Sequence, residues 1–172
     1  MYKPLTFKHD QWPEDNSAQG SNCYAYALDE KNYHWAIPGY GFFSGITYEA
    51  YANKFNTYFT QSKFPPEDFQ RAIVDGAIRD GLERVSDNPI ERDGYSLLAL
   101  FFPKEDKHYN DFHWYRKDDG GRWSQKRGIY QAQEVDDAGD LINDPKQACD
   151  THYKFHSFYL VPRKIVHSPS EI

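Results

Sequence analysis

The chain has 172 residues, a net charge of −6 and two cysteines, and 17% of its residues are aromatic. This length suits one domain with its own hydrophobic core. The negative charge argues against a nucleic-acid-binding protein, and no apolar run approaches the roughly 20 residues that span a bilayer. We therefore expect a single domain over residues 1–172, with its core over about 19–162 and a loose tail after residue 163.

Two cysteines, Cys23 and Cys149, are too few for a disulfide framework, although one bridge between them stays open. The N-terminal residues lack the apolar stretch of a signal peptide. These features favour a reducing cytoplasm, or export by a route that needs no conventional signal peptide. We expect no bound cofactor, and the sequence leaves the oligomeric state open.

A loop of small and polar residues leads into Cys23, and good helix formers follow it. Ser21 or Asn22 can cap this helix, which places Cys23 in the first turn. The unpaired N–H groups there carry partial positive charge, so we expect the thiol pKa to fall below its usual value of roughly 8.5. The same groups can donate hydrogen bonds to an oxyanion. The alternative is that Cys23 is a small buried hydrophobic residue.

The later elements change from helical to strand character along the chain. Residues 34–45, rich in glycine and aromatic residues, predict a loop that either packs on the core or walls a groove beside Cys23. Apolar residues at helical spacing predict helices after Thr47 and after Pro65. A continuous apolar run predicts a buried strand over 95–102, and further strands are expected at 112–116, 122–126, 131–135 and 155–162. Helices followed by hairpin-linked strands predict an α+β fold with an antiparallel sheet.

Seven histidines are present: His9, His34, His108, His113, His152, His156 and His167. His113 begins a predicted strand beside the most apolar one, which makes it either a catalytic base or a structural histidine in an aromatic cluster. His152 and His156 would share one face of a strand. No spacing around them matches a zinc site, so we expect no bound metal.

The order of these parts resembles the papain-like cysteine hydrolases, and in particular their NlpC-type branch. There a nucleophilic cysteine opens a helix, a base histidine begins a core strand, and a polar residue on the next strand orients the imidazole. The matching segments are Asn22-Cys23-Tyr24-Ala25, Phe112-His113-Trp114-Tyr115 and Trp123-Ser124-Gln125-Lys126. The second half is also similar to a group of uncharacterised bacterial proteins, in which a histidine stands where this chain has Gln125. The resemblance covers roughly residues 19–162.

The resemblance implies a papain-like fold, with N-terminal helices packed on a C-terminal antiparallel sheet. It also implies a cysteine peptidase, an amidase or a related acyl-transfer enzyme that acts on a peptide or other acyl substrate. Cys23 would be the nucleophile, His113 the base and Gln125 the orienting residue, while Gln19 would help to hold the oxyanion. Three aspartates in predicted turns are alternatives for the orienting role: Asp118, Asp140 and Asp144.

Two other interpretations stay open. The chain is a catalytically inactive binding module of the same fold, since Gln125 departs from the pattern of its apparent relatives. Alternatively, it is an aromatic-rich interaction protein in which Cys23 belongs to the core. Thiol reactivity near neutral pH distinguishes an active site from both alternatives.

Overall fold

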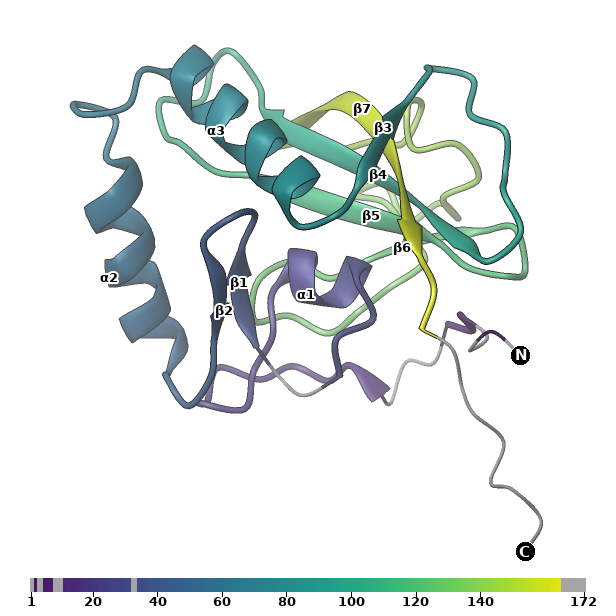
Figure 1. Ribbon diagram of the computed structural model, residues 1–172, viewed down its shortest axis with the longest axis horizontal. Coiled ribbons are helices and arrows are strands. Elements are labelled where there is room, and N and C mark those ends of the chain that lie inside the picture. Colours follow the sequence, from purple (N-terminus) through teal and green to yellow (C-terminus); the bar gives the residue numbers. More distant parts are fainter. Residues whose placement is uncertain (1, 3–4, 8–10, 32–33, 165–172) are drawn as a thin grey trace, which may run out of the picture.

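Five antiparallel strands form the main sheet of the computed structural model, which describes residues 2, 5–7, 11–31 and 34–164 (Figure 1). The strands lie in the order β3-β7-β4-β5-β6. Their bounds are Glu83–Val85 for β3, Tyr95–Pro103 for β4, His113–Lys117 for β5, Trp123–Gln125 for β6 and Tyr153–Pro162 for β7. The expected α+β class and the antiparallel sheet are confirmed, while the expected tail lies largely outside the described residues.

Three helices precede most of this sheet: α1 (Cys23–Ala27), α2 (Tyr48–Phe59) and α3 (Pro66–Arg79). The Asn22 side chain caps α1 by accepting a hydrogen bond from the Ala25 N–H, and Thr47 caps α2 in the same way. A proline opens α3, with two acidic residues in its first turn. No helix within the described ranges is long and apolar enough to cross a membrane.

Two sequence-based assignments are wrong. The expected loop at residues 34–45 contains a two-stranded antiparallel hairpin, β1 (Trp35–Ile37) and β2 (Gly41–Phe43). Each strand has only three residues, too few to show an alternating pattern. The expected strand at residues 131–135 is instead an irregular segment with isolated bridges at Gln133 and Val135.

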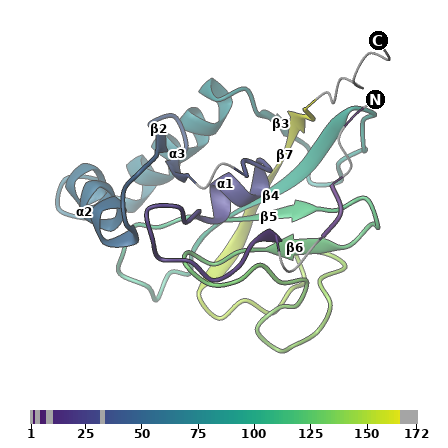
Figure 2. The same cartoon turned by 90° about the horizontal axis from the view of Figure 1, so that it is seen from below.

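The side chains of β4 pack into two hydrophobic cores, one on each face of the sheet. Leu98, Leu100 and Phe102 face the helices and the hairpin, whereas alternate residues such as Ala99 and Phe101 pack on the opposite face. The long connection between β6 and β7 lies on this second side (Figure 2). A strand buried on both faces needs no polar positions, which explains why its sequence shows no alternation.

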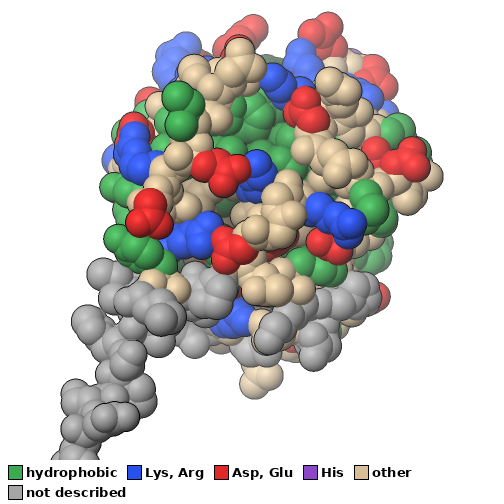
Figure 3. All heavy atoms as spheres, turned by 90° about the vertical axis from the view of Figure 1, so that its right-hand side faces the viewer, with side chains coloured by type: hydrophobic (Ala, Val, Ile, Leu, Met, Phe, Trp, Pro, Cys, Tyr) green, Lys and Arg blue, Asp and Glu red, His purple; other side chains and the backbone are tan. Residues whose placement is uncertain are grey.

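One outer face of the molecule carries charges of both signs. In Figure 3, acidic and basic side chains are interspersed around a hollow in which apolar side chains gather. Exposed ion pairs also occur in the molecule, such as the one between Arg92 and Glu83. Pairs of this kind contribute little to stability because water screens them.

Helix α3 and the hairpin approach closely at Gly76. A Cβ atom added to Gly76 would lie 2.1 Å from the carbonyl oxygen of Pro38, a backbone atom that cannot move aside. We expect Gly76→Ala to lower the free energy of unfolding by about 1–3 kcal/mol in chemical denaturation, despite the better helix propensity of alanine. Gly120→Ala is the control, because nothing lies within 4 Å of its added Cβ. An unchanged midpoint for Gly76→Ala would contradict this close approach.

Candidate functional site

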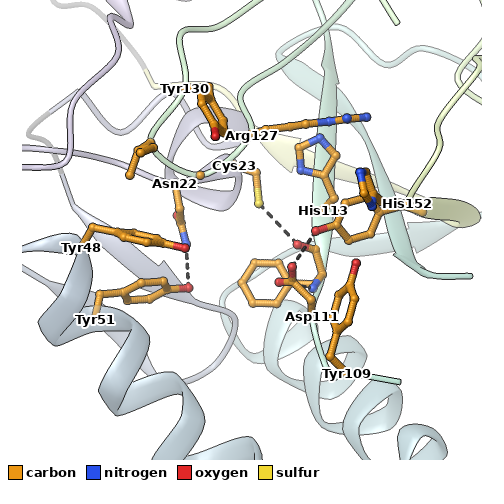
Figure 4. Close-up of a pocket in the computed structure, with 14 residues that line it drawn as sticks. Asn22, Cys23, Tyr48, Tyr51, Tyr109, Asp111, His113, Arg127, Tyr130 and His152 are labelled. Atoms are coloured by element: carbon orange, nitrogen blue, oxygen red, sulfur yellow. Dashed lines mark hydrogen bonds between the residues drawn. The ribbon is translucent and has the colours of Figure 1, made fainter. Parts of the chain in front are cut away.

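A cavity of about 490 Å³ opens beside the start of α1 and the start of β5 (Figure 4). Cys23 extends toward it from α1 and His113 from β5. Segments far apart in the sequence complete its walls: Asn22, Tyr48, Tyr51, Tyr109, Asp111, Phe112, Arg127, Gly128, Ile129, Tyr130, His152 and Tyr153. The cavity therefore brings the two residues that the sequence singled out for nucleophile and base to one site.

Contacts between α1 and β5 set how these two elements meet. The Tyr24 ring packs on Trp114 with ring centroids 5.3 Å apart. Arg116, only 1% exposed, donates from Nη1 to the Tyr26 carbonyl at 3.2 Å, and its guanidinium lies 4.2 Å from the Tyr26 ring centroid. Arg116 is on the same strand as His113, so it ties the cysteine helix to the histidine strand.

The Cys23 thiol is 5% exposed and donates a hydrogen bond to the Phe112 carbonyl, with Sγ and the oxygen 3.7 Å apart. Burial raises its pKa well above the usual value, and the nearby Asp111 carboxylate adds to the effect. Backbone N–H groups and the charge of Lys126 act less strongly in the opposite direction. The expected lowering of the thiol pKa is therefore wrong. Helix α1 has only five residues, and its weak dipole does not outweigh the loss of hydration.

His113 is 2% exposed, and its Nε2 lies 2.7 Å from Oε1 of Gln125. The Gln125 amide nitrogen donates to the Val135 carbonyl at 3.0 Å, so the amide oxygen faces the imidazole. This network assigns the proton of neutral His113 to Nε2 and leaves a lone pair on Nδ1. Burial lowers the pKa of His113 to about 4, although the hydrogen bond to Gln125 opposes this shift.

The other residues proposed from the sequence lie elsewhere. Gln19 is exposed and does not line the cavity, which removes the basis for its role at the oxyanion. Asp118 is buried and pairs with Arg116, whose Nε lies 3.1 Å from its Oδ1. Asp140 and Asp144 lie in irregular segments outside the strands, and neither lines the cavity. Of the four candidates for the orienting role, the structure brings only Gln125 to His113.

His152 lines the cavity, but it is not part of a metal-ligating group. Within the part of the chain that the structure describes, no three histidine, cysteine or acidic side chains gather closely enough to hold a metal ion. His156 lies away from the cavity, against the ring of Phe102. His9 and His167 fall outside the described residues.

Asp111 is a cavity residue that the sequence analysis missed. Its Oδ2 accepts a hydrogen bond from the Tyr153 hydroxyl at 2.5 Å. Burial raises the pKa of Asp111 to about 6, because no cation among the described residues pairs with it. Only the spacing of two residues from His113 connects Asp111 to the site in the sequence, and that spacing predicts no role.

The tyrosines of the cavity were also unexpected. Tyr48 and Tyr51 lie on the helix that was expected after Thr47, for which the sequence analysis proposed no role at the site. Tyr51 is buried, and its hydroxyl accepts a hydrogen bond from Nδ2 of Asn22 at 2.9 Å. Tyr48, Tyr109 and Tyr130 are exposed, so three aromatic rings contribute to the accessible wall of the cavity.

Lys126 supports another part of the cavity wall. Its buried Nζ donates to the carbonyl groups of Gly128 and Tyr130 at 2.8 and 2.9 Å, which shapes the loop that lines the cavity there. Burial lowers the pKa of Lys126 to about 8. This residue follows Gln125 directly, so the end of β6 and the residue after it supply the partner of His113 and the support of the loop.

These features define an α+β protein in which a cysteine helix and a histidine strand meet at a tyrosine-rich cavity. The chain belongs to the family of Insoluble matrix shell protein 1 from Ruditapes philippinarum. The two proteins are 32% identical over 145 residues, which cover 83% of this chain and 79% of its relative. No family model and no solved structure matches the chain.

Proposed function

We propose that the chain is a papain-like cysteine hydrolase that cleaves an amide or a related acyl bond. The observation that carries this proposal is that Cys23 and His113 line one cavity while Gln125 holds Nε2 of the imidazole. This leaves Nδ1 as the nitrogen available to the thiol proton. A thiol, a base and a residue that orients the base are the parts of a nucleophilic triad.

The directions of the two pKa shifts favour a neutral resting pair. The Cys23 thiol keeps its proton because burial raises its pKa, and the His113 imidazole stays uncharged above about pH 4. His113 therefore acts as a general base during the attack, rather than as the imidazolium of a preformed ion pair.

In the first step, Sγ of Cys23 attacks the acyl carbon as its proton passes to Nδ1 of His113. The backbone N–H of Cys23, in the first helical turn, donates to the oxyanion. His113 then gives this proton to the leaving group, and the carbon–nitrogen or carbon–oxygen bond breaks to leave a thioester. Finally, His113 takes a proton from water, which attacks the thioester and breaks the carbon–sulfur bond to release the acid. His113 then returns the proton to Sγ of Cys23, which restores the thiol.

The family relationship favours a second candidate function. The relative is named as an insoluble matrix protein of a shell, and that name describes a material rather than a reaction. In this alternative, the chain is a secreted matrix component in which Cys23 is only a buried core residue. The raised pKa of the Cys23 thiol is compatible with this role.

Mass spectrometry of the chain treated with p-nitrophenyl acetate separates these functions. Cys149→Ser is the background, because the exposed Cys149 would react without any active site. We expect one acetyl group on Cys23 at neutral pH, followed by its hydrolysis, and no adduct in the chain that also carries Cys23→Ala. A folded chain that leaves Cys23 unmodified, while the same chain unfolded in urea reacts, would support the matrix component instead.

A further inference from the structure

The orienting residue of the proposed triad has a second partner. Oε1 of Gln125 accepts a hydrogen bond from Nε of Arg127 at 3.2 Å, in addition to the one from His113. With the bond from the Gln125 amide nitrogen to the Val135 carbonyl, three contacts hold this amide. The guanidinium of Arg127 and the imidazole of His113 therefore share one acceptor atom, Oε1 of Gln125.

The guanidinium of Arg127 is itself held at every nitrogen. Its Nη1 lies 2.7 Å from Oδ1 of Asp137, and its Nη2 lies 2.8 Å from Oδ2 of Asp150. Backbone N–H groups hold both carboxylates: Thr151 donates to Asp137, and His152 and Tyr153 donate to Asp150. Because all three of its nitrogens have acceptors, Arg127 is not a free cation that awaits an anionic substrate.

We propose that Arg127, held by Asp137 and Asp150, is a positioning residue that fixes the tautomer of His113 through Gln125. We call this fixed orientation of Gln125 and His113 the lock. Its value for catalysis rests on the proposed function, but the lock itself is a property of the resting protein. It ensures that Gln125, a neutral residue, presents an acceptor oxygen to His113, as a carboxylate would by itself.

The physical reason lies in the symmetry of an amide. A glutamine side chain can turn its amide by half a turn and exchange oxygen for nitrogen at nearly the same positions. If Gln125 did so, its NH₂ would face His113 Nε2, and the imidazole proton would move to Nδ1. His113 could then no longer accept the proton of Cys23. Arg127 and the Val135 carbonyl both oppose this turn, because the Nε–H of Arg127 would then face another donor and the carbonyl would face the amide oxygen.

The charged groups that hold Arg127, and Arg127 itself, also shift the pKa of His113. The guanidinium of Arg127 lowers the pKa of His113, and the carboxylates of Asp150 and Asp137 raise it. The rings of Tyr115 and Tyr153 pack on the imidazole with centroids 5.3 and 5.2 Å away. Beyond these groups, the Cys23 thiol and the Asp111 carboxyl line the same cavity.

Nitrogen-15 NMR of the histidine rings in the full chain tests this proposal without any turnover. In the unmodified protein, we expect neutral His113 to carry its proton on Nε2. In Arg127→Met, we expect a mixture of tautomers and a His113 pKa that is higher by about one unit, since a nearby cation is lost. Arg127→Lys restores charge but not the Nε donor, so the pKa should return toward its original value while the tautomers stay mixed.

Asp137→Asn provides a change of opposite sign, since it removes a carboxylate that raises the pKa of His113. We expect that pKa to fall in this variant. Because Arg127 also loses the carboxylate that holds its Nη1, we expect a share of the Nδ1 tautomer to appear, and this tautomer decides the matter if Arg127→Met does not fold. Arg92→Met is the control, because Arg92 pairs with Glu83 at an exposed site away from the cavity. A folded Arg127→Met chain that keeps the original tautomer, whatever its pKa, or a folded Asp137→Asn chain that keeps it, would overturn the proposal.

Failure of this lock and failure of the proposed function give different results. If Cys23 is acetylated normally but the tautomer ignores Arg127, only the positioning role is wrong. If the tautomer responds to Arg127 but Cys23 never reacts, the lock exists in a protein that is not a hydrolase.

Discussion

Replacing His113 by alanine is expected to slow the acetylation of Cys23 by p-nitrophenyl acetate by about 10²–10⁴-fold, the usual contribution of a general base. The thiol of Cys23 keeps its proton at neutral pH because burial raises its pKa, so attack depends on a base in the cavity. The measurement is the rate of nitrophenolate release in the Cys149→Ser background. His108→Ala is the matched control, because His108 is exposed and does not line the cavity.

The pH dependence gives a further check on the same prediction. A base is active when unprotonated, and the pKa of His113 lies at about 4. The rate should therefore fall only as the pH approaches 4, rather than near the usual histidine value of about 6.5. A rate that is unchanged in His113→Ala would contradict the catalytic role, whatever the shape of the profile.

The largest expected effect on stability comes from Arg116. This side chain is 1% exposed and pairs with the carboxylates of Asp118 and Asp29 at 3.1 and 3.4 Å. Arg116→Met would remove the cation that lies beside these carboxylates in a largely buried region. We expect the free energy of unfolding to fall by about 3–5 kcal/mol, the range seen when one member of a buried ion pair is removed.

Chemical denaturation followed by tryptophan fluorescence measures this loss. Lys154→Met is the control, because Lys154 pairs with Glu105 in solvent and such pairs contribute about 1 kcal/mol or less. A loss in Arg116→Met no larger than that of the control would show that the buried network does not hold the fold. Since Arg116 also binds the Tyr26 carbonyl, the variant should disturb α1 and with it the placement of Cys23.

Local signals in the sequence were enough to predict the helices and the central strand. A side-chain cap at Asn22 and at Thr47, and a proline at the start of α3, each mark a helix start through contacts within a few residues. The apolar run of β4 reflects burial on both faces of the sheet. The hairpin at Trp35–Ile37 and Gly41–Phe43 was missed because packing on its neighbours, rather than its own pattern, stabilises it.

The site was predictable only in part, for a related reason. Cys23, His113 and Gln125 stand at element starts or on a short strand, and the order of elements indicates their proximity. Arg127 and Asp111 lie in connecting segments, whose positions depend on long-range contacts that no local pattern encodes. The direction of the Cys23 pKa shift was wrong because burial dominates it, and burial of one thiol cannot be deduced from helix position.

The backbone bridge between Gln125 and Gln133 covers one edge of the main sheet. Each residue donates its backbone N–H to the carbonyl of the other at 2.8 Å, so an irregular segment covers the outer side of β6. At the opposite edge, the outermost strand β3 has only three residues. Exposed edge strands carry unpaired backbone groups, with which a strand of a second chain can pair. The covered side of β6 and the short β3 therefore limit how far a second chain could extend the sheet from its outermost strands.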